Sequence, residues 1–207
     1  QYPGTEKQIH IPSLNIKRGE KICLTGKSGE GKTTFLNLFT NVLKPDHGER
    51  LIDKKEYSSI SPLFFQNKMT VISQETELFN LSLQENITLG QKIDEKDLYH
   101  TLEELDLLEW IEHLDRGLET IVGEKGLRLS AGQKQRVNLI RGMLLDREII
   151  LLDEPTSHLD EKTERNVIDF LKECLKNKTV IIVSHREALR ELCDRSYHIE
   201  NHQLIED

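Results

Sequence analysis

The sequence predicts an α/β fold, a mainly parallel β-sheet core into which an α-helical subdomain is inserted. Strand-length apolar runs alternate with longer amphipathic stretches before and after the middle of the chain, and this alternation is typical of a parallel sheet. Between residues 78 and 118, leucines recur at helical spacing among many acidic residues, which indicates solvated helices. We therefore expect one domain over residues 1–207, with a core of residues 1–76 and 146–207 and a helical subdomain at about 77–145.

The individual elements follow from apolar periodicity and from the residues that interrupt it. Residues 21–25 form a short apolar run that ends at Gly26, so they predict a buried strand. Residues 32–43 carry apolar side chains at helical spacing and are followed by the turn-forming sequence Pro-Asp-His-Gly at 45–48. The other expected strands are 69–73, 148–153, 179–184 and 196–200, and the other expected helices are 130–145, 161–176 and 186–193.

The composition excludes several classes of protein. The chain has 28 Lys and Arg against 36 Asp and Glu, a formal charge of −8, which argues against a protein that coats nucleic-acid phosphates. The best apolar runs, 149–152 and 180–183, have the length of strands and not of a membrane-spanning helix. Three cysteines without CxxC spacing indicate reduced thiols rather than a disulfide framework or a zinc site. We expect no nucleic-acid partner.

A glycine-rich loop joins the first expected strand to the first expected helix. Its sequence, GKSGEGKT at residues 26–33, satisfies the pattern G-x-x-x-x-G-K-[ST]. Glycines let backbone N–H groups curl around phosphate oxygens in conformations that a Cβ would obstruct. Lys32 supplies a positive charge for the β- and γ-phosphates, and the Thr33 hydroxyl is a hard oxygen ligand for Mg²⁺. The predicted nucleotide-binding residues are Gly26, Lys27, Ser28, Gly29, Glu30, Gly31, Lys32, Thr33 and Thr34.

Two consecutive carboxylates follow the apolar run 149–152. A strand that ends in Asp153 fits the second Mg²⁺-associated carboxylate of P-loop NTPases. Glu154 stands where it could take a proton from an attacking water or orient that water. Alone, the pair could merely end a strand; combined with the phosphate loop, it favours an NTPase site.

Residues 129–133, with the sequence Leu-Ser-Ala-Gly-Gln, resemble the signature motif of ABC ATPases, usually LSGGQ. Ala131 replaces the first glycine of that motif. The S-x-x-Q spacing from Ser130 to Gln133 is that of a capping box, so a helix should begin here, and a helix amino terminus can bind an anion. An ordinary helix cap is the alternative interpretation of this segment taken alone.

Other positions match the same family by resemblance. Gln74 resembles the Q-loop glutamine, which senses Mg²⁺ and faces the transmembrane partner, and His185 resembles the switch histidine that contacts the γ-phosphate. Residues 157–160 resemble the D-loop, although the family more often has Ala where His158 stands. Tyr2 is suitably placed for the aromatic that stacks on adenine, although the strand that normally precedes this aromatic is missing.

One branch of the family is favoured. Residues 120–126, TIVGEKG, are similar to the TxVGExG segment of ABC exporters, and residues 78–87 resemble the exporter pattern after the Q-loop. For residues 120–126, an ordinary loop with a glycine turn is the alternative interpretation. The chain begins at Gln1, and we expect a membrane domain upstream of it.

The resemblance implies a P-loop NTPase (RecA-like) core with an antiparallel β edge, and ATP hydrolysis with Mg²⁺ held by Thr33, Gln74 and Asp153. It implies that Lys32, Glu154 and His185 serve catalysis. It further implies a head-to-tail dimer with a second nucleotide-binding domain, in which Ser130, Gly132 and Gln133 cover the γ-phosphate bound by the other copy. Transmembrane domains are the other implied partner, at the cytoplasmic face of the membrane.

Two alternatives to a transport ATPase stay open at this point. An ABC-type ATPase acting on nucleic acid or ribosomes would share these motifs. A regulatory domain that binds nucleotide without hydrolysing it is the second alternative, which the joint presence of Lys32, Glu154 and His185 disfavours.

Overall fold

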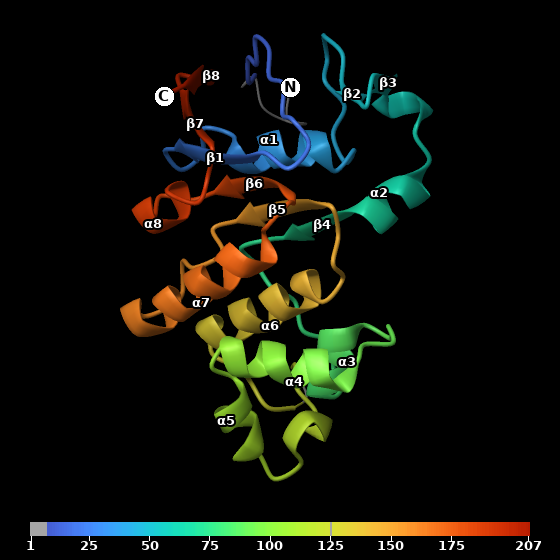
Figure 1. The fold of residues 1–207 in the computed structure, drawn as a ribbon, viewed down its shortest axis with the longest axis vertical. Helices are drawn as coiled ribbons and strands as arrows, with labels where there is room; N and C mark the ends of the chain where they lie inside the picture. Colours follow the sequence, from blue (N-terminus) through green and yellow to red (C-terminus); the bar gives the residue numbers. More distant parts are fainter. Residues whose placement is uncertain (1–7, 125) are drawn as a thin grey trace. The chain divides into compact units, whose positions relative to one another are not determined.

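The computed structural model describes residues 8–124 and 126–207, which fall into two compact units (Figure 1). The first unit contains the described residues up to Val71 together with Arg147–Asp153 and Asn177–Asp207. The second contains Ile72–Asp146 and Glu154–Lys176. In the part of the chain that the structure describes, no helix has both the length and the apolar character that a membrane crossing requires.

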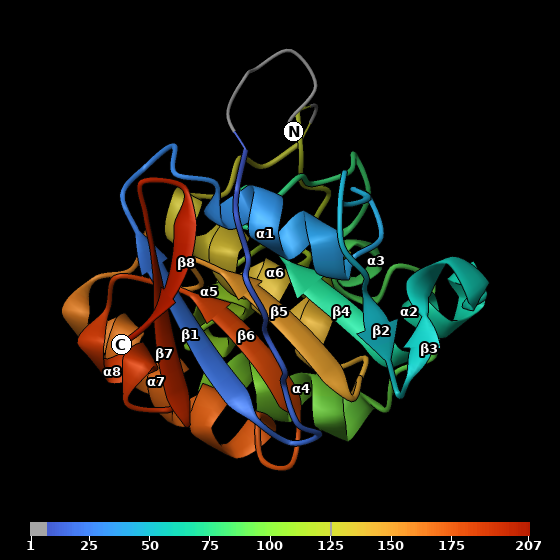
Figure 2. The same ribbon diagram turned by 90° about the horizontal axis from the view of Figure 1, so that it is seen from above.

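A six-stranded sheet forms the centre of the first unit, with the strand order β4-β5-β6-β1-β7-β8. Its strands are β1 (Lys21–Gly26), β4 (Met69–Ile72), β5 (Ile149–Asp153), β6 (Thr179–Val183), β7 (Arg195–Glu200) and β8 (Gln203–Glu206). Strand β1 pairs in parallel with β6 and β7, and β5 pairs in parallel with β6. Strand β8 pairs antiparallel with β7 at the edge of the sheet (Figure 2). The expected mainly parallel sheet with an antiparallel edge is confirmed.

Short helices connect these strands. They are α1 (Lys32–Phe39), α2 (Pro62–Lys68) and α8 (Glu187–Arg190), with a two-stranded ribbon of β2 (Leu51–Ile52) and β3 (Lys55–Glu56) and a 3₁₀ turn at Tyr57–Ser59. The chain runs from β1 through α1 toward the β4 edge, and from β6 through α8 toward the opposite edge. Because such crossovers are right-handed, α1 and α8 cover opposite faces of the sheet (Figure 1).

Apolar side chains of the sheet and of α1 form the core of this unit. Ile22 and Leu24 of β1 are buried and pack with Phe35 and Leu36 of α1, and Cys23 between them is buried as well. Helix α1 ends at Phe39, four residues before the expected end. The physical reason is Asn41, whose φ of +62° is a left-handed conformation that stops the helix and that Asn tolerates better than most residues.

The second unit is helical. It contains α3 (Leu83–Thr88), α4 (Glu95–Glu104), α5 (Leu108–Glu112), a 3₁₀ turn at Gly117–Glu119, α6 (Ala131–Met143) and α7 (Glu161–Cys174). This unit extends beyond the expected subdomain at 77–145, because α7 contacts α4 and Asn166 of α7 donates a hydrogen bond to Asp106. The sequence placed α7 in the sheet core, since its alternation with strands resembles an ordinary crossover.

Candidate functional site

The glycine-rich loop leaves β1 at Gly26 and enters α1 at Lys32. Gly31 has a φ of +105°, and a Cβ built on it would lie 2.3 Å from Cδ1 of Ile9. A Cβ on Gly26 would lie 2.9 Å from the carbonyl oxygen of Ile199. A side chain is therefore disfavoured at both ends of the loop, and a backbone without a Cβ at these positions can approach phosphate oxygens closely.

The amino end of α1 is built to receive an anion. Among the described residues, no side chain caps the first turn of this helix, because its N-cap is Gly31. Its first N–H groups therefore lack a side-chain acceptor, and the helix dipole favours negative charge there. The ammonium of Lys32 donates hydrogen bonds to the carbonyl oxygens of Gly26 and Lys27, so this charge lies over the loop itself. These groups fit the phosphates of a nucleoside triphosphate.

Thr33 and Asp153 are brought together from distant parts of the chain. The Thr33 hydroxyl donates a hydrogen bond of 3.3 Å to the carboxylate of Asp153, the last residue of β5. Burial raises the pKa of the Asp153 carboxyl, while the Thr33 hydrogen bond and the charge of Lys32 oppose that rise. A hydroxyl beside a carboxylate offers two hard oxygen ligands of the kind that Mg²⁺ prefers, so these two residues fit that ion.

His185 follows the carboxyl end of β6, at the same end of the sheet as Asp153. Across three adjacent strands, Leu24 of β1 pairs with Val183 of β6, which pairs with Asp153 of β5. The glycine-rich loop, His185 and Asp153 therefore lie at the carboxyl ends of these parallel strands, which is where open α/β sheets bind ligands.

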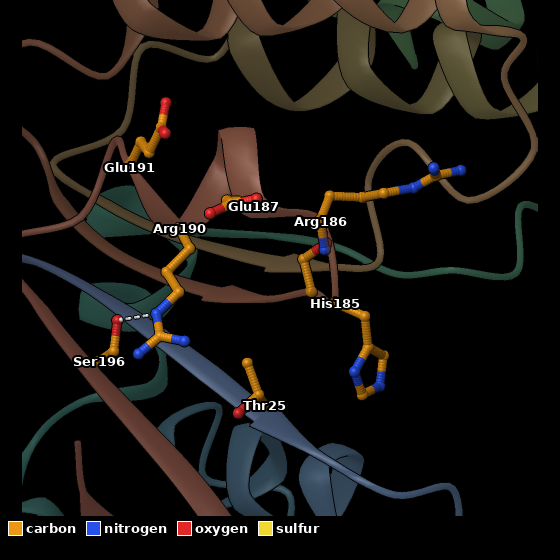
Figure 3. Close-up of a pocket in the computed structure, with 8 residues that line it drawn as sticks. Thr25, His185, Arg186, Glu187, Arg190, Glu191 and Ser196 are labelled. Carbon is orange, nitrogen blue, oxygen red and sulfur yellow. Dashed lines mark hydrogen bonds between the residues drawn. The ribbon is translucent and has the colours of Figure 1, made fainter.

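A pocket of about 420 Å³ lies beside His185 on the α8 side. It is lined by Thr25, Ser184, His185, Arg186, Glu187, Arg190, Glu191 and Ser196. Arg190 donates a hydrogen bond to Ser196 within it, and the side chains of His185 and Arg186 leave the end of β6 in different directions (Figure 3).

The signature segment lies in the second unit and begins α6. The Ser130 hydroxyl accepts a hydrogen bond from the Gln133 amide at 3.2 Å, and the Gln133 side chain accepts one from the Ser130 amide at 2.9 Å. The expected capping box is therefore present. A Cβ on Gly132 would lie 3.0 Å from the His158 carbonyl oxygen, so this glycine lets α6 approach the 157–160 turn closely.

Two more predicted site residues belong to the second unit. Gln74 is exposed, two residues beyond the end of β4. Glu154 has a φ of +48°, in the left-handed region that is uncommon for residues other than glycine. Tyr2 lies outside the described residues. The first unit thus brings together the glycine-rich loop, Asp153 and His185, while the signature residues, Gln74 and Glu154 lie in the second unit.

Gln135 is a polar residue of this region that the sequence reasoning missed. Its side chain is buried in α6, on the stripe that also buries Leu139 and Gly142. A glutamine at a buried position of a helix was the available signal, because a buried amide needs hydrogen-bond partners. Those partners prove to be Glu154, Ser157 and His158.

Comparison with known proteins now identifies the family. The family described as "ABC transporter" matches residues 9–157. The chain belongs to the ABC transporter family. It is the ATP-binding ATPase domain of that family, built on a P-loop NTPase core, and the signature resemblance at residues 129–133 agrees with this assignment.

The similar proteins are larger transport proteins. The chain is 36% identical to an "ATP-dependent lipid A-core flippase" of Vibrio vulnificus strain YJ016 over 99% of the chain and 36% of that protein. It is also 36% identical to the "Glutathione/L-cysteine transport system ATP-binding/permease protein CydD" of Bacillus subtilis, over 97% of the chain and 35% of that protein. The chain therefore spans about a third of the length of these curated relatives.

A solved structure agrees with these relatives. The structure described as "a bacterial Atm1-family ABC exporter with ATP bound" superposes with a TM-score of 0.84 at 28% identity, covering 90% of this chain and 33% of that one. Transport ATPases of the exporter type are thus the proteins that this domain resembles in both sequence and fold, and the nucleic-acid alternative is disfavoured.

Proposed function

We propose that this chain drives export across a membrane by binding and hydrolysing ATP with Mg²⁺, as a pair of nucleotide-binding domains attached to transmembrane domains. The observation that carries the proposal is that the glycine-rich loop, the Thr33–Asp153 pair and His185 all lie at the carboxyl ends of the parallel strands. The exporter relatives support the direction of transport.

Each residue has a proposed role in hydrolysis. Lys32 and the loop amides hold the β- and γ-phosphates, and His185 contacts the γ-phosphate. Thr33, Asp153 and Gln74 would hold Mg²⁺, which when bound offsets phosphate charge as the transition state forms. Glu154 orients the attacking water and accepts its proton. Together these groups stabilise charge on the transferred phosphoryl group, which is the main requirement of such a reaction.

The signature segment points to a second copy of the domain. The amino end of α6, with Ser130, Gly132 and Gln133, offers helix N–H groups and a hydroxyl to an anion. We propose that it covers the γ-phosphate held by the other copy in a head-to-tail pair. ATP would then hold the two copies together, and hydrolysis would release them, as an order-and-release switch does in other NTPases.

An exposed apolar surface of the second unit supports a transmembrane partner. Phe79, Leu81, Ile121 and Leu127 are 40–54% exposed. Backbone hydrogen bonds hold their segments together: the Val122 amide donates to the Leu81 carbonyl, and the Leu127 amide donates to the Ile121 carbonyl. Clustered exposed apolar side chains mark interaction surfaces, so we propose that the transmembrane domains dock here, at the cytoplasmic face of the membrane.

The decisive test is Glu154→Gln in the full-length protein. We expect ATP binding to be retained, hydrolysis to be lost and an ATP-dependent dimer to accumulate, measured by nucleotide binding, phosphate release and size-exclusion chromatography. Lys32→Ala is the matched control, because it should lose ATP binding and therefore also the dimer. Wild-type turnover in Glu154→Gln, or a dimer that ignores ATP, would contradict the proposal.

A further inference from the structure

The side chain of Gln135 is a buried clamp within the second unit. It projects from α6, five residues after Ser130, and only 3% of the residue is exposed. Its Nε2 donates to the Glu154 carbonyl oxygen at 2.7 Å and to the Ser157 hydroxyl at 3.2 Å. Its Oε1 accepts a hydrogen bond of 3.1 Å from the His158 amide. One side chain thus fastens both ends of the segment 154–158 to the helix that carries the signature residues.

The orientation of this amide is dictated by its partners. The Glu154 carbonyl oxygen can only accept a hydrogen bond, so the amide nitrogen must face it. The His158 amide can only donate, so the amide oxygen must face that group. No other uncharged side chain of this length supplies a donor at one point and an acceptor at the other, and a methionine of similar length supplies neither.

The clamp acts on a backbone that has an unfavourable conformation. Glu154 has a φ of +48°, a left-handed conformation that costs a non-glycine residue free energy unless its surroundings hold it there. Its carbonyl accepts the short bond from Gln135 and a longer one, 3.3 Å, from the Ser157 amide. The direction of the Glu154 side chain depends on this φ, because Cβ moves with the backbone.

We propose that Gln135 is a positioning residue for ATP hydrolysis, which fixes the backbone of Glu154 and thereby the aim of its carboxylate. The inference rests on the role proposed above for Glu154. Gln135 acts on Glu154 through the carbonyl oxygen of that residue. It also joins the Glu154 backbone to α6, the helix whose amino end carries the signature residues Ser130 and Gly132.

A purely structural role and a positioning role predict different measurements. If Gln135 only satisfied buried hydrogen bonds, its loss would lower the melting temperature and the fraction of folded protein, and each folded molecule would hydrolyse ATP normally. If Gln135 positions Glu154, kcat falls while the KM for ATP is preserved, because Glu154 is needed for the reaction and not for nucleotide binding.

The test compares Gln135→Met with two other variants in the full-length protein. Ser157→Ala removes one hydrogen bond of the clamp but keeps the one to Glu154. Val137→Ala is the matched control on the same helix: it lowers stability by removing fully buried methyl groups and leaves every hydrogen bond of Gln135 in place. ATPase kinetics, ATP binding and melting temperature are measured for each.

We expect Gln135→Met to lower kcat about 100-fold, the scale of misplacing a reacting group by about 1 Å. The KM for ATP should stay within about twofold of wild type, as for a change that acts on the transition state. Val137→Ala should keep wild-type kcat per folded molecule. If Gln135→Met does not fold, Gln135→Glu replaces it, since it keeps the size and the acceptor but lacks the donor, and the same loss of kcat is expected.

Three outcomes would overturn the inference. They are a normal kcat in the Gln135 variants, an equal loss in Val137→Ala, and a loss in Ser157→Ala as large as in Gln135→Met. The last outcome would assign the effect to the 157–158 turn instead of Glu154. Failure of the proposed function is distinguishable, because it would appear as wild-type turnover in Glu154→Gln whatever the Gln135 variants do.

Discussion

The hydroxyl of Thr33 lies 3.3 Å from the carboxylate of Asp153, although 120 residues separate the two in sequence. Thr33 is in the first turn of α1, and Asp153 ends β5, two strands away from β1 in the sheet. The pairing therefore depends on strand order. It unites a hydroxyl and a carboxylate in the geometry on which the proposed Mg²⁺ dependence rests.

Thr33→Val should lower kcat by about 100-fold and raise the Mg²⁺ concentration needed for half-maximal activity, because the isosteric valine offers no oxygen to the ion. Thr33→Ser, which keeps the hydroxyl, should retain most of the activity. The measurement is ATPase rate against Mg²⁺ concentration. An unchanged Mg²⁺ requirement in Thr33→Val would show that the Thr33 hydroxyl is not a ligand.

Gly31→Ala should weaken ATP binding by about fivefold to 150-fold, since forcing a non-glycine residue into a positive φ costs about 1–3 kcal/mol. The new methyl would also collide with Ile9. Adding Ile9→Ala should restore affinity only partly, because it relieves the collision but not the strain of the φ of +105°. The measurement is the Kd for ATP.

Gly48→Ala is the matched control for the Gly31 prediction. Gly48 also has a positive φ, +87°, but a Cβ there would meet nothing within 4 Å. Gly48→Ala should lower the free energy of unfolding and leave the Kd for ATP unchanged. Equal effects of the two variants on ATP affinity would refute a specific role for the loop backbone at Gly31.

Arg141→Ala should destabilise the second unit by about 2–3 kcal/mol, since Arg141 is charged and half-buried and its loss strips partners from polar groups. Its guanidinium donates to the backbone carbonyls of Glu77 and Asn86 and to the Asn86 side chain. Arg141→Lys should retain only part of the stability that Arg141→Ala loses, because a lysine cannot donate to three acceptors in one plane. Urea unfolding measures both; a loss below about 0.5 kcal/mol, the size of an ordinary surface substitution, would contradict this role.

The capping box at the start of α3 should make stability depend on pH. Hydrogen bonds from the backbone amide and the hydroxyl of Ser82 lower the pKa of Glu85 below its ordinary value of 4.5. A carboxyl whose folded pKa is lowered contributes stability above its unfolded pKa and loses it as the pH falls through the folded pKa. The stability difference between wild type and Glu85→Gln should therefore be constant near neutral pH and shrink below about 4.5. Thermal unfolding from neutral to acidic pH measures it, and a difference that does not vary with pH would count against the assignment.

Local patterns explain how much of this protein could be predicted from its sequence. The phosphate loop at 26–33, the strand that ends at Asp153 and the capping box at Ser130 each depend on residues close together in the chain. Hydrogen bonds between near neighbours and the periodicity of burial are decided by that local chemistry. The mainly parallel sheet was predictable for the same reason, because alternating strand and helix patterns leave few other arrangements.

The tertiary structure decided what depends on distant residues. The order β4-β5-β6-β1-β7-β8 brings Asp153 to Thr33, and no local pattern specifies which strands become neighbours. The membership of α7 in the helical unit likewise follows from its packing on α4, and the role of Gln135 follows from acceptors about 20 residues later in the chain. The sequence by itself determined the local structures, namely the phosphate loop, the strands and the helix caps, because spacing along the chain sets local backbone geometry. Only the folded chain decided which of them meet, because contacts between distant segments depend on the packing of the whole sheet and its helices.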